Sequence, residues 1–261
     1  MAITATTGQT ASNTTAGTSL AAAAFSATAG QHLLVAVALA TTTASVSTIT
    51  DTAGNTYARQ STITNGTSVV VELWAATGIT GNASNVVTVT FSASTLAAIA
   101  IEEYSGLVSS YFGTPATATG TGTWPVASLT TVDGGSWTVA AIGFACSSGD
   151  TFSQWEGTIR QSVVPSLTSV GVALVDNAPG GDGTIPTGAG LSASRAWAAA
   201  AVEMRTHATA IVYAEYAGIL PVPSTTLVPR PVNGLVQYIE PLRERGSLTT
   251  VVIQESGNVV Y

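Results

Sequence analysis

A chain of 261 residues with 46% hydrophobic and only 8% charged residues can bury a substantial core. Its seven basic residues are all arginines and stand against 14 acids, giving a net charge of −7, which argues against nucleic-acid binding by phosphate neutralisation. No apolar stretch reaches the ~20 residues that a membrane-spanning helix needs, and the single cysteine, Cys146, is expected to be a buried thiol.

The scarcity of charge also bears on where the protein works. A free monomer normally relies on surface charge for its solubility, so this composition favours a protein that works inside an assembly. The first residues, MAITATTGQTASNTTAG, contain no Lys or Arg, whereas a signal peptide begins with a basic region. We therefore expect a protein that is made in the cytoplasm and not exported by a conventional signal.

Strands dominate the first half. Alternating or continuously apolar runs predict them over Ile3–Thr7, Leu20–Ser26, Gln31–Ala40, Val46–Thr50, Ser68–Ala75, Val86–Phe91 and Leu96–Tyr104. The last run is rich in alanine, but its isoleucines and its Tyr-Ser-Gly exit favour a strand over a helix. Between Val46 and Tyr57, the turn formers Asp51, Gly54 and Asn55 predict a β-hairpin or a tight β-corner.

The second half repeats this style. Strands are predicted over Ser136–Cys146, over Thr158–Val164 paired with Leu167–Val175, and over Arg195–Arg205. Strands every 10 to 15 residues, turns rich in Gly, Asn and Asp, and the lack of a convincing helix predict an all-β protein, an antiparallel β-sandwich of jelly-roll type over residues 1–206. The similarity of Ala98–Leu107 to Ala210–Leu220 is interpreted as two similar strand exits and not as a repeat.

Residues 207–261 form a different, proline-rich segment. Pro221, Pro223, Pro229 and Pro231 predict an extended, polyproline-like linker. Strands over Leu235–Ile239 and Leu248–Gln254 around a charged turn predict a small β unit after it, and a third strand could end at Tyr261. Because so small a unit buries little apolar area, we expect it to act as an assembly arm that pairs with the main domain or with a neighbouring chain.

Residues with catalytic or metal-binding chemistry are few. His32 and His207 lie far apart, and one Cys with two scattered His makes no zinc site, so we predict neither an enzyme nor a cofactor. Glu102 and Glu103 are neighbours on a strand and point to opposite faces; one is expected to face solvent and the other to cap a turn or pair with an arginine. Asp176 and Asp182 lie in runs that offer oxygens to Ca²⁺, but turns explain them better.

The tryptophans suggest a binding hypothesis. Trp74 and Trp197 lie in patterned strands and are expected in the core. Trp124, before a proline, and Trp155, in FSQWEG, lie in loop-like contexts. They are candidate ligand or interface contacts, with packing beneath loops or between subunits as the alternative.

Several short runs resemble a widespread β-sandwich module of bacterial surface proteins and phage structural proteins. The resemblance covers residues 20–206 and rests on Asp51, Gly54-Asn55, Tyr57, Trp74 and Glu103-Tyr104-Ser105-Gly106. It implies the sandwich fold and no catalytic residues. The missing export signal and the added proline-rich arm favour a phage component over a secreted bacterial domain.

From these features we expect a virion structural protein of a tailed phage. The leading hypothesis is a capsid decoration protein that binds copies of itself, as a trimer, and the major capsid or other virion proteins through strand or arm exchange. One alternative is a glycan- or receptor-binding module of a tail fibre. Another is a self-assembling extracellular filament subunit.

Overall fold

The structure of the protein is a computed structural model. It describes residues 2–107, 112–132, 135–166, 169–178 and 183–205, together with the backbone of four strands within 210–253. The chain divides into two compact units, Met1–Thr206 and His207–Tyr261, which are described separately. The described residues are all-β with antiparallel pairing and contain no helix, as the sequence predicts.

The first half of the larger unit is a sandwich of two main sheets. Its larger sheet has the order β1 (Thr4–Ser12), β10 (Ala97–Ser105), β4 (His32–Leu39), β7 (Val69–Ala76) and β6 (Ala58–Asn65). Its smaller sheet has the order β2 (Gly17–Ala21), β9 (Val87–Thr95) and β5 (Val46–Asp51), and the short strands β3 (Phe25–Ala27) and β8 (Asn82–Asn85) pair with each other.

The second half repeats this topology. Its five-stranded sheet has the order β11 (Ala116–Gly122), β18 (Arg195–Met204), β13 (Trp137–Cys146), β16 (Ser169–Asn177) and β15 (Thr158–Val163). Its three-stranded sheet has the order β12 (Val126–Thr131), β17 (Gly183–Leu191) and β14 (Phe152–Gln154). When the short strands β3 and β8 are left out and the remaining eight strands of each half are numbered from 1, both larger sheets follow the order 1-8-3-6-5 and both smaller sheets the order 2-7-4. The protein is therefore a tandem of two jelly-roll-like sandwiches.

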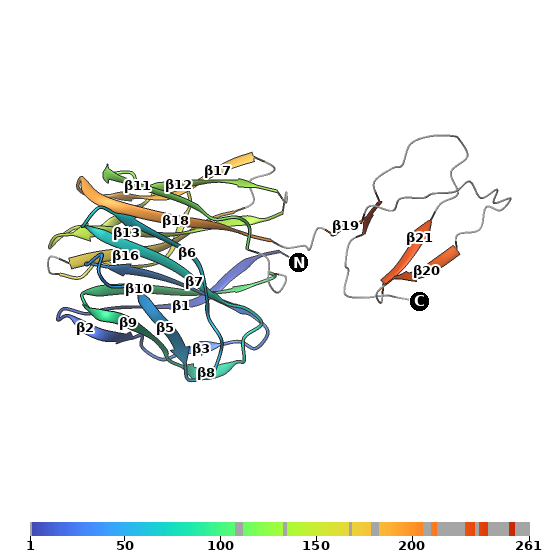
Figure 1. Ribbon diagram of the computed structural model, residues 1–261, viewed down its shortest axis with the longest axis horizontal. Helices are drawn as coiled ribbons and strands as arrows, with labels where there is room; N and C mark the ends of the chain where they lie inside the picture. The colour runs from blue at the N-terminus through green and yellow to red at the C-terminus, as the bar shows by residue number, and fades with distance from the viewer. Residues whose placement is uncertain are drawn as a thin grey trace. The chain divides into compact units, whose positions relative to one another are not determined.

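The two five-stranded sheets pack face to face. A central cluster of buried residues draws on both halves, with Leu34, Val71 and Ala100 from the first and Val139, Val172 and Ala200 from the second. A separate core lies between the two sheets of each half. The result is four layers with the three-stranded sheets outermost, and in Figure 1 β2, β9 and β5 lie at one side of the stack and β12 and β17 at the other.

This layering explains the continuous apolar runs. Every residue of β4 is buried, as are nearly all residues of β10, β13, β16 and β18. A strand in a two-layer sandwich buries one face and alternates with polar residues, whereas a strand covered on both faces needs no alternation. The runs that predict strands therefore mark the two inner layers.

The strand pairing decides between two predicted alternatives and shows a duplication that the sequence does not predict. The stretch from Val46 to Tyr57 is not a hairpin, because β5 pairs with β9 while β6 pairs with β7 in the other sheet. It is a tight β-corner, the other structure predicted for this stretch, and it takes the chain from one sheet to the other. The sequence predicts no repeat, whereas the strand order relates residues 4–105 to residues 116–204 through their topology and not through similar residues.

The smaller unit contributes four described strands. β19 (Ala210–Val212) pairs with β22 (Val251–Ile253), and β20 (Val228–Val232) pairs with β21 (Leu235–Ile239). β21 has the bounds that the sequence predicts, and β22 lies inside the predicted strand Leu248–Gln254. The two do not pair with each other, however, and the segment with Pro229 and Pro231 is a paired strand where a free polyproline-like linker is predicted.

Candidate binding surface and buried polar network

The sequence candidates Trp124 and Trp155 come together on the outer face of the second half. Their ring centroids lie 5.0 Å apart at an interplanar angle of 48°. Trp124 is 54% exposed and Trp155 is partly buried. Among the described residues, Trp124 and Val132 are the large hydrophobic side chains that remain exposed.

The backbone ladder explains where Trp124 lies. Ala189 donates to the carbonyl of Pro125 at 3.1 Å and Leu191 donates to the carbonyl of Thr123 at 2.8 Å, which continues the β12–β17 pairing past the start of β12. Trp124 is therefore opposite Gly190. A Cβ on Gly190 would lie 3.1 Å from Cζ3 of Trp124 and would collide with Oγ of Ser153, so the ring occupies space that only glycine leaves open.

Trp155 reaches the same place from the β14–β15 connection. Ser153, two residues before it, pairs with Gly190, and the carbonyl of Glu156 accepts a hydrogen bond from Gly188 at 3.1 Å. Glu156 has φ of 49°, a left-handed conformation that costs a non-glycine residue free energy. Sequence reasoning missed Gly188 and Gly190, although their i, i+2 spacing on one strand face is a signal for a close approach of another group.

The turn residues of the first half form a closed hydrogen-bond network. The Asp51 carboxylate accepts from the backbone and the side chain of Asn55 at 2.9 and 2.8 Å, from the Tyr57 hydroxyl at 2.8 Å and from Asn85 at 3.1 Å. Partial burial opposes ionisation, but these donors together hold the pKa of Asp51 below its usual value. Gly54 takes φ of 76°. These residues hold the corner between β5 and β6.

A cavity of about 570 Å³ lies beside this corner and is lined by residues that include Asn55, Gln60, Thr77 and Phe112. Its described lining carries no charged side chain. Among the described residues, no group of three or more His, Cys, Asp or Glu side chains could hold a metal ion.

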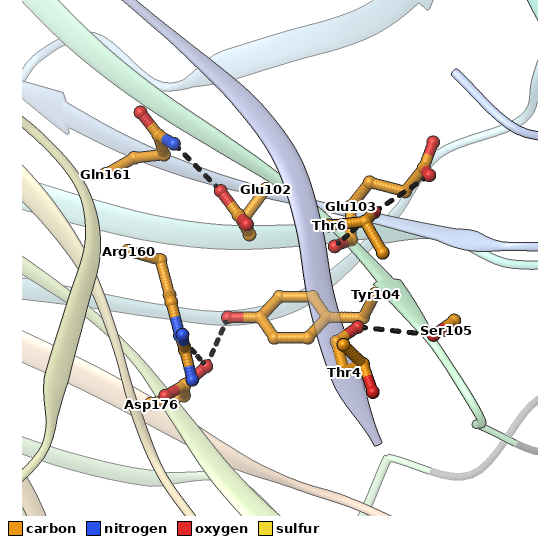
Figure 2. A network of polar contacts seen from close by, with 9 residues as sticks. All are labelled: Thr4, Thr6, Glu102, Glu103, Tyr104, Ser105, Arg160, Gln161 and Asp176. Carbon is orange, nitrogen blue, oxygen red and sulfur yellow. Dashed lines mark hydrogen bonds and ion pairs between the residues drawn. The ribbon is translucent and has the colours of Figure 1, made fainter. Parts of the chain in front are cut away.

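A buried polar network joins the two halves (Figure 2). The Tyr104 hydroxyl donates to Oδ2 of Asp176 at 3.0 Å, and Nε of Arg160 donates to the same oxygen at 2.6 Å. Glu102, on the same strand as Tyr104, accepts from Nε2 of Gln161 at 2.9 Å. The network thus ties β10 of the first half to β15 and β16 of the second.

Burial controls the electrostatics of this network. It raises the pKa of Asp176 and that of Glu102, because desolvation of the charged form outweighs the partners that favour it. It also raises the pKa of Tyr104 far above its usual value. Oδ1 of Asp176 is buried without a hydrogen-bond partner among the described residues. Both carboxyl groups are buried between the two halves and do not line an open site.

Glu103 has a counterpart in the second half. Its carboxylate accepts from the backbone of Thr28 at 2.8 Å and from Thr6 at 2.9 Å. Glu203, at the equivalent position of β18, accepts from the backbone of Val132 at 2.9 Å and from Ser136 at 2.7 Å. Each Glu fastens the segment that leads into the third main strand of its half. The prediction that Glu102 or Glu103 faces solvent is wrong, because both are buried. The second half covers the face of β10 that carries Glu102, and Glu103 lies on the opposite face, bonded to residues of its own half.

The remaining sequence candidates are placed as follows. Trp197 is buried and Trp74 is partly buried. Cys146 is buried, and desolvation raises the pKa of its thiol.

His32 is buried at the start of β4, 3.3 Å from the carbonyl of Leu107. Pro229 and Pro231 lie in β20, whereas Pro221, Pro223, Asp182, His207 and Tyr261 lie outside the described residues.

The part of the chain that the structure describes has no helix long and apolar enough to cross a membrane. Comparisons with family models, with curated proteins and with solved structures find no match to this chain.

Proposed function

We propose that this chain is a structural protein of a tailed-phage virion, a capsid decoration protein that assembles by strand addition through its C-terminal unit. The observation that carries the proposal is the pairing of β20 with β21. The engagement of the buried carboxylates in structural contacts and the low charge of the chain support an assembly role over a catalytic one.

The prolines decide which edge of the β20–β21 ribbon is open. The register pairs Val228 with Ile239, Arg230 with Gln237 and Val232 with Leu235, while Pro229 and Pro231 face Tyr238 and Val236. Proline has no N–H, so the ladder bonds run through the first three pairs. Alternate residues of a strand direct their N–H groups to opposite edges. The backbone nitrogens of Pro229 and Pro231 therefore face the outer edge of β20, and that edge has no N–H donor at either position.

The same register leaves β21 able to accept a further strand. The N–H groups of Val236 and Tyr238 point away from β20, and among the described strands β21 has no second partner. An exposed strand edge is a template for pairing with another chain, and a two-stranded ribbon is only marginally stable alone. A third strand from a neighbouring copy or from a capsid protein would stabilise the ribbon, and prolines on β20 would direct it to β21.

The test removes the two outward donors without breaking the ribbon. The double variant Val236→Pro, Tyr238→Pro loses N–H groups that the ladder does not use, and Val236→Ala, Tyr238→Ala is the matched control that changes the same side chains and keeps the donors. We expect the alanine variant to form the oligomer of the natural chain by light scattering and the proline variant to remain monomeric, with the same circular dichroism. Oligomers of equal mass in both variants would refute the proposal.

Binding to capsids tests the decoration role itself. Purified chain would be mixed with phage capsids that lack it, and the bound copies would be counted after sedimentation. We expect saturable binding of the natural chain and loss of binding in the proline variant. No binding of the natural chain would refute decoration.

A further inference from the structure

We propose that Trp124 and Trp155 form a binding platform for a neutral sugar ring of a glycan. This site belongs to the larger unit and does not depend on strand addition at β21. It goes beyond an assembly role, because it gives the outer face of the second sandwich a ligand of its own.

The first argument is the exposure of the Trp124 ring beside a second indole. Burying an indole is worth several kcal/mol of apolar transfer free energy, and the other tryptophans of the larger unit are more buried than Trp124. Trp124 stays 54% exposed although it contacts a second indole. An exposed aromatic cluster on a protein surface marks an interaction site.

The second argument is that the platform is built into the sheet. Gly190 has no side chain on the outer face of β17, the central strand of the three-stranded sheet. The Trp124 ring therefore extends from one edge of this sheet across Gly190 toward Ser153 on the other edge. Glu156 holds a left-handed backbone conformation directly after Trp155. Residues on either side of each tryptophan pair with β17, which fixes the two segments that carry the rings. A preorganised site loses little conformational entropy when a ligand binds.

The third argument is the chemistry around the rings. Ser153, opposite Gly190, and Glu156, directly after Trp155, are exposed, and they offer a hydroxyl and a carboxylate group. A pyranose has the complementary pattern, because its C–H groups can lie on an aromatic face while its hydroxyls exchange hydrogen bonds at the edge.

The fourth argument is charge. β12, β14 and β17 contain no Arg or Lys. In the described part of the second half, Arg160, Arg195 and Arg205 are each paired with a carboxylate, those of Asp176, Asp150 and Glu203. With a chain charge of −7, this face has no cation to offer an anionic ligand such as a phosphate or a sialic acid. The ligand that fits is therefore neutral.

The test uses a glycan array of neutral and anionic oligosaccharides, followed by calorimetric titration of the best neutral one. We expect binding that weakens by about tenfold or more in Trp124→Ala and in Trp155→Ala, the effect typical of aromatic hot spots. Val132→Ala is the matched control, since it removes the other exposed large hydrophobic side chain, and it should bind as the natural chain does.

Three outcomes would overturn the proposal. They are no binding to any neutral glycan, equal binding by the tryptophan variants, and a loss of self-association in Trp124→Ala with no effect on glycan binding, which would make the pair a subunit contact. Trp155→Phe keeps an aromatic face and should retain most of the affinity, which separates loss of the platform from misfolding. The proline variant of β21 should bind glycan normally, so that failure of the assembly proposal and failure of this one can be told apart.

Discussion

Replacing Tyr104 with Phe tests whether the two halves are held together by their buried polar network. The change removes only the hydroxyl that donates to Asp176 at 3.0 Å. The Asp176 side chain is fully buried, and its other oxygen already lacks a partner among the described residues. Because a hydrogen bond to a charged group contributes 1.5–3 kcal/mol, we expect the variant to lose about 2 kcal/mol of unfolding free energy at pH 7.

The pH dependence of that loss gives a second check. Burial raises the pKa of Asp176 in the folded protein above its value in the unfolded chain, about 4. The free energy of unfolding that is linked to protonation of Asp176 is therefore fully present below the unfolded pKa and is lost as the pH rises through the folded pKa. The hydrogen bond from the Tyr104 hydroxyl stabilises the ionised Asp176 carboxylate more than the protonated one. The difference between Tyr104→Phe and the natural chain should therefore shrink as the pH falls toward about 4.

The assay is urea unfolding followed by tryptophan fluorescence, with Tyr57→Phe as the matched control. The Tyr57 hydroxyl also donates to a carboxylate, that of Asp51, but Asn55 and Asn85 continue to bond to this carboxylate. We expect about 1 kcal/mol or less for the control. Equal losses in the two variants, or a loss in Tyr104→Phe that does not change with pH, would refute the account of the network.

Three further predictions follow from local contacts. The pKa of the Asp51 carboxylate is lowered because its hydrogen bonds outweigh its desolvation. Its contribution to the free energy of unfolding is therefore present above about pH 4 and is lost as the pH falls through the folded pKa. The difference in urea midpoint between the natural chain and Asp51→Asn should narrow in acid, and a difference that stays constant with pH would contradict this. Gly143→Ala would place a Cβ against Cγ2 of Val71 between the two inner sheets and should lower the free energy of unfolding by about 1–3 kcal/mol. At Gly17 a Cβ would meet only atoms at 3.6 Å or beyond, so Gly17→Ala should lower it by less than about 1 kcal/mol. The Cys146 thiol is buried with a raised pKa, so it should react with a thiol reagent only as fast as the protein unfolds; rapid reaction of the folded chain would show that the second core is open.

The sequence predicts the strongly apolar strands well. β4, β10, β13 and β18 lie within a residue or two of their predicted bounds, because continuous apolar runs ending in turn formers have few other solutions. β11, β12 and β17 escape prediction since they are rich in Thr, Gly and Ala, whose side chains carry little strand signal. These strands form edges and outer layers, where backbone pairing and not side-chain burial sets the structure.

The duplication and the platform could not be predicted for a related reason. Equivalent strands of the two halves share their pairing order but few residues, as the equivalence of Tyr104 with Met204 illustrates. The loop contexts of Trp124 and Trp155 make both rings candidates, but their meeting depends on the register that sets Trp124 and Ser153 opposite Gly190. Register across a sheet is a long-range property that a single strand's pattern does not contain.

The central functional claim is that the C-terminal unit attaches the protein to a particle. Its most direct test is the number of copies bound per capsid for the full chain and for a chain that ends at Thr206, which keeps the compact unit Met1–Thr206. We predict saturable occupancy for the full chain and none for the shortened one, with both showing the same unfolding transition of the sandwiches. Equal occupancy by the two chains would contradict the claim.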